Sequence, residues 1–426
     1  MTIYTVRSGD TVNSIAVANG TSAERIIADN RLTAPYELVV GQTLVLQYPE
    51  IVHTVEAGDT LRSIAEEYGV TVQELYRNNP ILGGVDNIYD GQTIVISYGT
   101  PPLGNIRLNG YAYPYISDEQ IRSVLPYLTY LSIFSYGIND DGTLISPTGG
   151  DERLIALARE YGTVPLMMLT SLSSDGTFSN ELVNRVLGDP AMRSAVISSA
   201  LETVRSKDYG GIDVDFEYIS PQYAEEYASF VAELNNALGE EYEVFVALAP
   251  KTSRDQPGLL YESHDYRALG EAADNAFLMT YEWGYQFGPP MAVSPLDKVR
   301  EVVDFAVTEI PPQKLYLGIP SYGYNWTLPY VPGESQAASA PPLAAVELAR
   351  EVGAEIMFDE VSAAPFFTYT EDGADHIVWT QDARSVDALS RLVSEYGMRG
   401  AGIWNIMRPF PQMWPVLNGL YEIEKL

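Results

Sequence analysis

The chain has 426 residues, of which 46% are hydrophobic and 19% charged, and these fractions predict a folded globular protein. Its formal net charge of −32 argues against binding nucleic acid or an anionic membrane through a general basic surface, so we expect neutral or cationic partners. The absence of cysteine excludes disulfides and a catalytic thiol, and with only three histidines we expect no metal site and no cofactor. No apolar run approaches the roughly 20 residues that span a bilayer, and the first residues lack the regions of a signal peptide, so we expect neither membrane insertion nor a signal peptide.

The first hundred residues contain an internal repeat. Residues 4–16, which begin Tyr4-Thr-Val-Arg-Ser-Gly-Asp-Thr, match residues 53–65, which begin His53-Thr-Val-Glu-Ala-Gly-Asp-Thr. The match resumes at Gly41-Gln-Thr and Gly91-Gln-Thr. Each unit predicts a strand, a Gly-Asp-Thr turn, two helices and a second strand. We therefore expect two small domains, at residues 1–49 and 50–98.

These two units resemble LysM domains throughout their length, because both terminal motifs recur in order in each unit. The resemblance implies a βααβ fold and binding of glycans that contain N-acetylglucosamine (GlcNAc), as in peptidoglycan or chitin. It implies contact with the glycan at the loop after the first strand and the loop before the last strand of each unit. The candidate residues are those of the Gly-Asp-Thr turns, Gly9, Asp10, Thr11, Gly58, Asp59 and Thr60. The same turns are also suited to capping the first helix of each unit through Asp10 or Thr11 and Asp59 or Thr60. We expect both roles, because LysM grooves use the backbone of this turn.

Residues 99–105 are rich in proline and glycine and form a predicted linker, after which short apolar runs alternate with amphipathic segments. We expect eight strands, at residues 107–113, 127–136, 164–169, 211–217, 244–250, 276–281, 314–321 and 400–404. Helical patterns lie between them, for example at residues 152–161, 190–207, 223–238 and 385–396. Two of these helices are expected to open on a capping residue followed by proline, at Asp189-Pro190 and Ser220-Pro221.

This alternation predicts that residues 106–426 form a (β/α)8 barrel, whose active site would lie at the C-terminal ends of the strands. A doubly wound open sheet is the alternative, but no Gly-rich phosphate loop follows the first strand. The fold expected for the whole chain is therefore an α/β TIM barrel preceded by two small domains.

The fourth expected strand carries three acids at alternate positions. Asp213, Asp215 and Glu217 share one face, while the apolar residues between them share the other. Three buried carboxylates side by side are costly unless they share protons, pair or serve chemistry, which makes this strand the candidate acid/base site. Asp215 and Glu217 lie roughly 6.5–7 Å apart along the strand and approach a bond from one side. Asp215 is thus poorly placed to attack the opposite face of a sugar, and attack by the substrate's own 2-acetamido oxygen resolves the difficulty.

The stretch Gly210-Gly-Ile-Asp-Val-Asp-Phe-Glu217 is similar to the acidic signature of family-18 glycoside hydrolases, the chitinase type. The resemblance implies that Glu217 is the general acid and then the base, that Asp215 orients the acetamido N–H, and that Asp213 supports Asp215. Met279-Thr-Tyr281 matches the family's Met-x-Tyr, which implies a hydrogen bond from Tyr281 to the acetamido oxygen. Trp404 would form the floor under the cleaved sugar. Further substrate contacts are expected at Met279, Glu282, Trp283 and Tyr285, although the last two also suit ordinary loop packing.

Four features depart from the family pattern. Gly210 replaces the first acid of the signature, at the far end of the strand from the site. The family's Ser-x-Gly-Gly on the third strand is replaced by Leu169-Thr-Ser-Leu, and Glu282 stands where many chitinases have Asp. Only about 50 residues separate the seventh strand from Val378, which we judge too few for a full chitinase α+β insertion domain. A shallower cleft is therefore expected.

The segment Met279-Thr-Tyr-Glu-Trp-Gly-Tyr285, together with the tandem N-terminal units, is similar to the spore cortex-lytic N-acetylglucosaminidases of spore-forming bacteria. This implies a retaining, substrate-assisted enzyme associated with the spore coat or cortex and anchored to peptidoglycan by its LysM domains. Because muramic lactam lacks a free acetamido group, the sugar attacked should be GlcNAc. The alternatives are a chitinase acting on chitin oligomers and a non-catalytic wall or coat protein, although such proteins usually lose the terminal glutamate that this chain keeps as Glu217.

Overall fold

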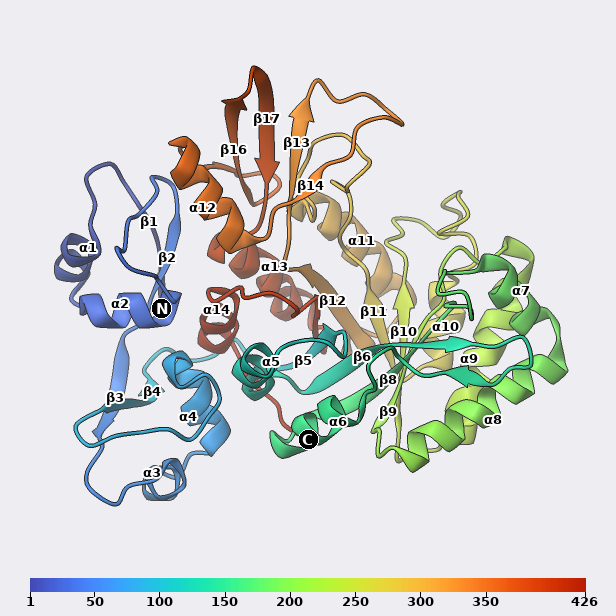
Figure 1. The fold of residues 1–426 in the computed structure, drawn as a ribbon. Coiled ribbons are helices and arrows are strands. Elements are labelled where there is room, and N and C mark those ends of the chain that lie inside the picture. The colour runs from blue at the N-terminus through green and yellow to red at the C-terminus, as the bar shows by residue number, and fades with distance from the viewer.

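Eight parallel strands close into a barrel, and the structure, a computed structural model, describes all residues from 1 to 426 (Figure 1). Neighbouring strands follow one another in chain order, and the first strand pairs with both the second and the last, which closes the ring. The strands are β5 (Asn105–Ala112), β6 (Tyr130–Ile138), β8 (Val164–Thr170), β9 (Gly211–Asp215), β10 (Glu243–Leu248), β11 (Asn275–Leu278), β12 (Leu315–Pro320) and β18 (Gly400–Trp404). The expected (β/α)8 barrel is confirmed.

Helices cover the outside of the barrel between consecutive strands (Figure 1). They are α5 (Asp118–Val124), α6 (Glu152–Glu160), α7 (Asn180–Gly188), α8 (Pro190–Ser206), α9 (Ala224–Leu238), α10 (Tyr266–Ala272), α11 (Leu296–Glu309), α13 (Ala383–Tyr396) and α14 (Met413–Leu420). Two short strands extend the sheet, β7 (Leu144–Ile145) beside β6 and β19 (Glu422–Ile423) beside β5.

The two expected helix starts with proline have different outcomes. Asp189 caps α8 as expected, because its carboxylate accepts hydrogen bonds from the first free N–H groups of the helix. The expectation for Ser220 is wrong. Residues 221–223 form a 3-10 turn without a side-chain cap, and α9 begins only at Ala224. The Ser220 hydroxyl instead accepts a hydrogen bond of 2.8 Å from Asn184, so it ties the loop after β9 to α7.

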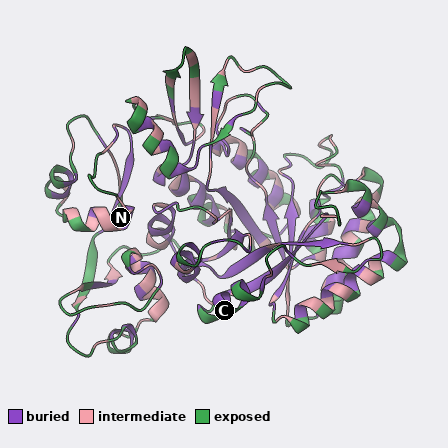
Figure 2. Cartoon of the chain, in the orientation of Figure 1, coloured by how far each residue is buried: buried purple, intermediate pink, exposed green.

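Alternation along the strands separates two buried layers, and Figure 2 shows the barrel strands almost wholly buried. Ile212 and Val214 of β9 and Phe216 just after it are 0% exposed and pack in the large core between the barrel and its helices. The inside of the barrel holds a separate cluster of aromatic and apolar side chains, including Tyr111, Met168, Phe245 and Phe277. The acids of β9 therefore point into the barrel interior, as the period of two predicts.

The two N-terminal units have the expected order of elements (Figure 1). The first unit contains β1 (Thr2–Thr5), α1 (Val12–Asn19), α2 (Ala23–Asn30) and β2 (Thr43–Leu46). The second contains β3 (Pro49–Thr54), α3 (Leu61–Tyr68), α4 (Val72–Asn78), a 3-10 turn (Pro80–Leu82) and β4 (Thr93–Tyr98). In each unit the two strands pair antiparallel and the helices cover them.

The threonine of each Gly-Asp-Thr turn is the helix cap. Thr11 accepts from the N–H of Ser14, and Thr60 accepts from that of Ser63, each within a reciprocal capping box. The aspartates before them have a different task. Asp10 accepts a hydrogen bond of 2.8 Å from the N–H of Arg7, and its counterpart in the second unit accepts the equivalent bond, so both close the turn.

The stretch between β12 and α13 holds more structure than we expected from its length. Residues 324–379 form a five-stranded antiparallel sheet with one helix, a small α+β subdomain on top of the barrel (Figure 1). Its elements are β13 (Tyr324–Leu328), β14 (Ala338–Ser339), α12 (Pro342–Val352), β15 (Met357–Asp359), β16 (Ala364–Glu371) and β17 (Ala374–Trp379). About 50 residues are enough for such a sheet, because its strands have only two to eight residues and two of them are joined by a two-residue hairpin turn.

Both N-terminal units are docked against the barrel domain, which the sequence did not indicate. In the first unit the N–H of Ile356 donates to Val40 O at 2.9 Å, and Val39 shares a small apolar core with α12. In the second unit Arg77 is 5% exposed and donates to Pro126 O at 3.3 Å, while its own carbonyl accepts from Tyr127. Buried polar contacts of this kind indicate a fixed joint between the units and the barrel.

Gly41 lies at the closest approach in this joint, and Gly91 is its counterpart in the repeat. Both have left-handed backbone, with φ of +86° and +82°. A Cβ on Gly41 would lie 1.8 Å from Ile356 O, whereas one on Gly91 would meet nothing within 4 Å. The same motif position is thus a domain contact in the first unit and free in the second.

Replacing Gly41 by alanine should therefore destabilise the protein more than replacing Gly91. Both changes carry a backbone strain of about 1–2 kcal/mol, but only G41A adds an overlap that costs about 1–3 kcal/mol more unless the first unit moves away. Thermal unfolding measures the difference, and small-angle X-ray scattering should show a larger radius for G41A than for G91A. Equal losses in the two variants would contradict a fixed joint.

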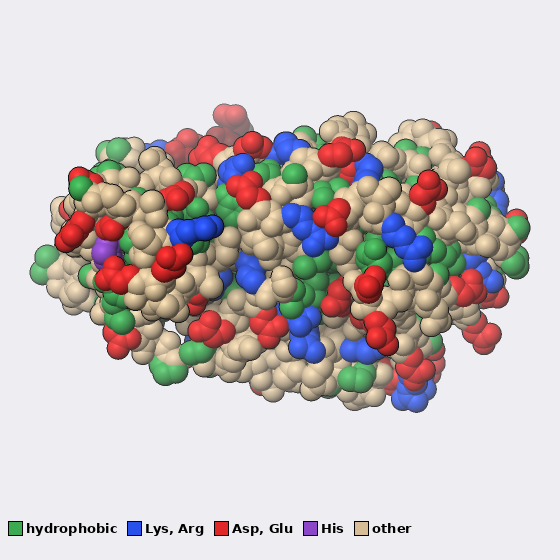
Figure 3. Space-filling model, turned by 90° about the horizontal axis from the view of Figure 1, so that it is seen from below, with side chains coloured by type: hydrophobic (Ala, Val, Ile, Leu, Met, Phe, Trp, Pro, Cys, Tyr) green, Lys and Arg blue, Asp and Glu red, His purple; other side chains and the backbone are tan.

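The chain carries 57 acidic and 25 basic side chains. On the face seen in Figure 3 the two kinds are interspersed, and no extended basic patch forms there. None of the helices is both long and apolar enough to cross a bilayer.

Candidate active site

The three acids of the fourth strand lie at increasing height in the barrel. Asp213 is 0% exposed, and its Oδ2 accepts hydrogen bonds from Ser132 at 2.7 Å and Asn109 at 3.4 Å. Asp215 ends β9, and its Oδ1 is buried without a hydrogen-bond partner. Glu217 lies just beyond the strand end. The deepest acid is thus held by the barrel through its Oδ2, although its Oδ1 also lacks a partner, while the upper two lie nearer the mouth.

Burial governs the protonation of these acids. It raises the pKa of Asp213 and of Glu217 above their ordinary values. The pKa of Asp215 is raised well above its ordinary value, first by burial and then by the charges of Glu217 and Asp213. Two neighbouring carboxyls that both resist ionisation titrate as a pair. The Asp215–Glu217 pair therefore keeps a proton at a pH where isolated carboxyls have lost theirs, as a general acid requires.

A cleft of about 440 Å³ opens above this pair. Asp215 and Glu217 line it together with the remaining residues that the sequence assigned to substrate, which are Tyr281, Trp404, Met279, Glu282, Trp283 and Tyr285. The structure therefore brings these eight residues to one place. Asp213 lies below them and does not line the cleft.

Tyr281, three residues after β11, contributes a polar hydroxyl to the cleft, and Trp404, the last residue of β18, contributes an apolar ring. Burial, followed by the charges of Asp215 and Glu217, raises the pKa of Tyr281 well above its ordinary value, so its hydroxyl stays protonated and able to donate. The Trp404 ring packs on Tyr111 and Phe134, with ring centroids 5.7 and 5.3 Å apart. It is thus a supported flat surface at the cleft, suited to a sugar face.

Glu282 is fixed at the rim by the small α+β subdomain. Its carboxylate accepts hydrogen bonds from the hydroxyls of Tyr322 and Tyr324, the latter at 3.1 Å. Its backbone is left-handed, with φ of 70°, and the residue after Glu217, Tyr218, has φ of 53°. Non-glycine residues in this conformation are concentrated at functional sites. No residue of the subdomain's sheet lines the cleft itself, so the cleft has no wall from it.

A family of known proteins matches the part of the chain that carries this site. The model of Glycosyl hydrolases family 18 matches residues 108–408, which include all three acids and Trp404. The chain belongs to glycosyl hydrolase family 18. The LysM domain model matches residues 4–47 and 53–97, so the two N-terminal units are LysM domains. The protein is thus a family-18 glycoside hydrolase with two LysM domains, as the sequence indicated.

Relatives of this family-18 hydrolase match along its whole length. The chain is 39% identical to the cortical fragment-lytic enzyme of Bacillus subtilis, over 100% of this chain and 99% of the relative. The crystal structure of the Bacillus cereus spore cortex-lytic enzyme SleL has a TM-score of 0.83 at 35% identity, covering 100% of this chain and 98% of that one. A chitinase from Chromobacterium violaceum, at 23% identity, TM-score 0.69 and coverage of 74% and 99%, shares the fold.

Sequence reasoning missed several residues that line the cleft of this family-18 domain. Tyr111, Met168, Ala247 and Phe277 come from four different strands and all face the barrel interior. Alternation along each strand contained this signal, because every second residue of a barrel strand points inward. Tyr261 also lines the cleft but lies in the loop after β10, where no periodicity identifies it.

His264 is a further residue that the sequence did not reveal. It is 0% exposed, and burial lowers its pKa to about 4, so its ring is neutral at ordinary pH. Its Nδ1 accepts from the N–H of Ala249 at 3.0 Å, which leaves Nε2 as the donor to Phe216 O at 3.2 Å. Phe216 is the residue between Asp215 and Glu217. His264 therefore fixes the backbone that carries the two acids to the end of β10.

We expect His264→Phe to lower kcat more than it changes KM, because Phe216 O and the Ala249 N–H lose their partner and the acids lose their support. Its stability should fall by about 1–3 kcal/mol. Tyr266→Phe is the matched control, since Tyr266 is equally buried and donates to Ala249 O at 2.6 Å but does not reach Phe216. His264→Gln, which keeps a donor, should recover part of kcat. If both Phe variants lost stability and kcat in the same proportion, His264 would be an ordinary core residue.

The glycan-binding turns expected in the LysM domains lie outside this cleft. Gly9 and Gly58 are exposed with φ of +85° and +99°, and a Cβ on either would meet nothing within 4 Å. The side chains of Asp10, Thr11, Asp59 and Thr60 are engaged within their own units, in bonds to the turn, to the first helix and to the first strand. What each turn offers to a ligand is therefore chiefly its exposed backbone.

Proposed function

We propose that this protein is a retaining, substrate-assisted N-acetylglucosaminidase that hydrolyses spore cortex peptidoglycan or its fragments on the GlcNAc side. The observation that carries the proposal is which carboxyl groups line the cleft. Only Asp215, Glu217 and Glu282 line it, and Glu282 is already occupied by two tyrosine hydroxyls. The two remaining acids lie two residues apart at the end of β9 and approach from one side, so a nucleophile from the opposite face must come from the substrate.

In the proposed reaction Glu217 donates its proton to the leaving glycosidic oxygen. The acetamido oxygen of the substrate attacks the anomeric carbon and displaces the leaving sugar. Asp215 accepts the acetamido N–H and stabilises the cyclic cation that forms, and Tyr281 donates to the acetamido oxygen. Glu217 then removes a proton from water, which opens the cyclic intermediate from the face that the first sugar left. Two inversions give net retention, and Asp213 supports Asp215 from below.

The proposed substrate follows from the chemistry and from the relatives. The assisted route requires a 2-acetamido group on the sugar attacked, and muramic lactam of cortex has none, so GlcNAc carries the scissile bond. The full-length relatives are named as cortex-lytic enzymes of Bacillus. We further propose that the protein acts at the spore and that its LysM turns, at residues 9–11 and 58–60, hold peptidoglycan.

Product analysis tests the proposal. Purified cortex fragments and chitin oligomers of matched length are incubated with the enzyme, and the new reducing ends are identified by borohydride reduction and mass spectrometry. We expect GlcNAc at every new reducing end, faster turnover of cortex fragments, and an initial β-anomer by proton NMR. An initial α-anomer, or muramic acid at the new ends, would refute the mechanism, and preference for chitin would refute the substrate.

A further inference from the structure

A loop of the barrel carries an exposed aromatic ring to the cleft. It joins β11 to α11 and comprises residues 279–295. Two backbone hydrogen bonds close its base, one of them from the N–H of Gly284 to Ala292 O at 3.0 Å. Beyond this base lie residues 285–291, which we call the tip loop. Its first residue, Tyr285, lines the cleft and is 42% exposed.

Three donors of the small α+β subdomain hold the tip loop. They reach three successive carbonyl oxygens, those of residues 286, 287 and 288. The bonds run from Ala337 N–H to Gln286 O at 2.7 Å, from the Tyr330 hydroxyl to Phe287 O at 2.9 Å, and from Trp326 Nε1 to Gly288 O at 2.9 Å. An exposed loop without a core of its own keeps one conformation where its backbone groups are bonded in this way. The subdomain contributes no residue to the cleft, but it fixes a loop that does.

Gly288 lies directly against the Tyr285 ring. A Cβ on Gly288 would lie 2.5 Å from Cε1 of Tyr285 and 2.6 Å from its Cδ1, so the ring packs on the bare glycine backbone. The N–H of Gly288 also donates to Tyr285 O at 3.0 Å, which closes the same tight turn. Trp326, which holds the Gly288 carbonyl, is 1% exposed and therefore fixed within the subdomain. The position of the Tyr285 ring thus depends on that of Trp326.

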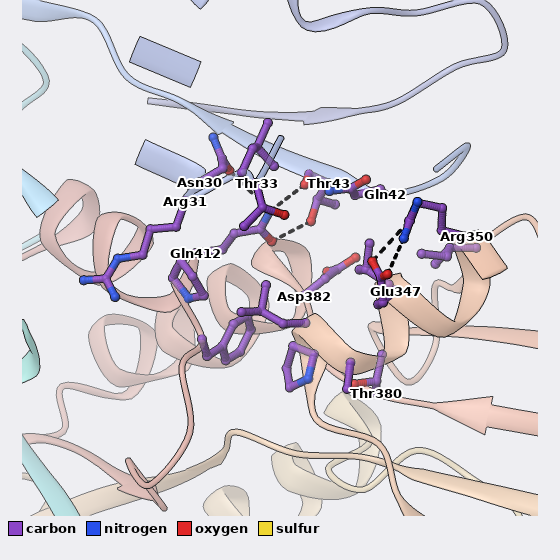
Figure 4. Close-up of a pocket in the computed structure, with 18 of the residues that line it drawn as sticks. Asn30, Arg31, Thr33, Gln42, Thr43, Glu347, Arg350, Thr380, Asp382 and Gln412 are labelled. Atoms are coloured by element: carbon purple, nitrogen blue, oxygen red, sulfur yellow. Dashed lines mark hydrogen bonds and ion pairs between the residues drawn. The ribbon is translucent and has the colours of Figure 1, made fainter. Parts of the chain in front are cut away.

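The subdomain that supplies these donors is itself anchored on another side. Figure 4 shows its helix α12, which carries Glu347 and Arg350, opposite Gln42 and Thr43 of the first LysM domain across a pocket that both line. Arg350 forms an ion pair of 2.8 Å with Glu37 of the same domain. The three donors therefore belong to a frame that the rest of the molecule holds in place.

We propose that Trp326 is a positioning residue, which fixes the Tyr285 ring against the glycan through the carbonyl of Gly288. The contact between this ring and the glycan rests on the proposed function. A half-exposed tyrosine ring at a cleft is a stacking surface for a sugar face. Asp215 and Glu217 move the protons, whereas Tyr285 offers binding that is equal before and in the transition state. Displacing the ring therefore raises KM and leaves kcat unchanged.

Trp326→Phe tests the proposal, because it removes the Nε1 donor and keeps an aromatic ring. We expect KM for cortex fragments to rise roughly fivefold, the effect of one hydrogen bond, with kcat within about twofold of the parent. Amide hydrogen exchange of residues 285–291 should become faster. Trp379→Phe is the matched control, since Trp379 lies on β17 of the same sheet and its Nε1 has no hydrogen-bond partner. It should keep the parent KM and the parent exchange rate.

A double-variant cycle separates positioning from general packing. Tyr285→Ala should raise KM roughly tenfold, and Gly288→Ala, which displaces the ring, should do nearly the same. Gly99→Ala is the control for the added methyl, because a Cβ there would meet only the end of the Glu50 side chain, at 3.3 Å. In the Tyr285→Ala protein, Trp326→Phe should raise KM no further, because the ring that it positions is gone.

An unchanged KM in Trp326→Phe, a loss confined to kcat, or an additive increase in the double variant would each overturn the proposal. An equal rise in KM for Trp379→Phe would also overturn it, because Trp326 would then serve only the packing of the subdomain. The proposed function is judged separately, by cleavage of cortex fragments with the parent protein. If the parent does not cleave, that function is rejected, and the same variants are compared by calorimetric Kd for the fragments, with the same outcomes deciding the role of Trp326.

Discussion

Glu217→Gln is expected to lower kcat by roughly 10²–10⁴-fold with little change in KM, because glutamine fills the same space but neither gives nor takes the proton. Reducing-sugar release from cortex fragments measures the loss. Glu225→Gln is the matched control, since it makes the same change at an exposed position of α9 near the same strand end. This control should keep the parent rate. A Glu217→Gln protein within about tenfold of the parent would exclude Glu217 as the general acid.

The pH profile gives a second measure of the same residue. Burial raises the pKa of Glu217, so its acid form persists to a higher pH than that of an ordinary glutamic acid. Activity should fall as pH rises and the Asp215–Glu217 pair loses its proton, and it should fall again at low pH, when the pair takes up a second proton. The parent profile is therefore bell-shaped, with its basic limb displaced upward. A flat profile would argue against the paired carboxyls.

Asp215→Asn is expected to lower kcat by roughly 10²–10³-fold, the effect of removing one group that stabilises charge in the transition state. The acid limb of the pH profile should disappear with it, because the second proton has no place to bind. Asp213→Asn is the comparison, since Asp213 lies below the cleft and already accepts from Ser132 and Asn109. It should lose less activity. If the two variants lost equal activity, Asp215 would have no special role toward the acetamido group.

The stability of Asp215→Asn provides a control with a defined sign. The pKa of Asp215 in the folded protein is raised well above 3.8, so the folded state binds the proton more tightly than the unfolded chain. Its ionisation therefore costs stability as pH rises above about 3.8, the ordinary value. Asparagine avoids this cost, and the variant should melt no lower than the parent at pH 7. A large drop in melting temperature would attribute lost activity to misfolding.

The barrel and its acids were predictable because they depend on local patterns. Alternation placed Asp213 and Asp215 on the inner face of β9 and Glu217 on the same side just beyond it, and the Asp189-Pro190 pair gave the start of α8. The small α+β subdomain was also visible in principle. Asp372 and Gly373 form the two-residue turn between β16 and β17 with φ of 51° and 80°, and Asp-Gly between alternating residues is a strong hairpin signal. We did not expect the subdomain, because the stretch of about 50 residues between the seventh strand and Val378 suggested too little room for it.

The joint between domains and the support of the acids were not predictable from one sequence. Gly41 and Gly91 have the same motif and the same backbone, and only the position of Ile356 in space distinguishes them. His264 acts on a carbonyl 48 residues earlier in the chain, and no local pattern encodes that contact. Such features depend on tertiary packing.

The docked LysM domains change how anchoring acts on an insoluble glycan. A flexible tether would bring the cleft to many bonds around the anchoring point, each at a moderate effective concentration. A fixed joint restricts the cleft to bonds at one distance and direction from the bound sugar. The effective concentration of the cleft is high at those bonds and close to zero at all others. After each cut the protein must therefore release its anchor to reach a new bond, so anchoring that is too tight would slow turnover on long chains.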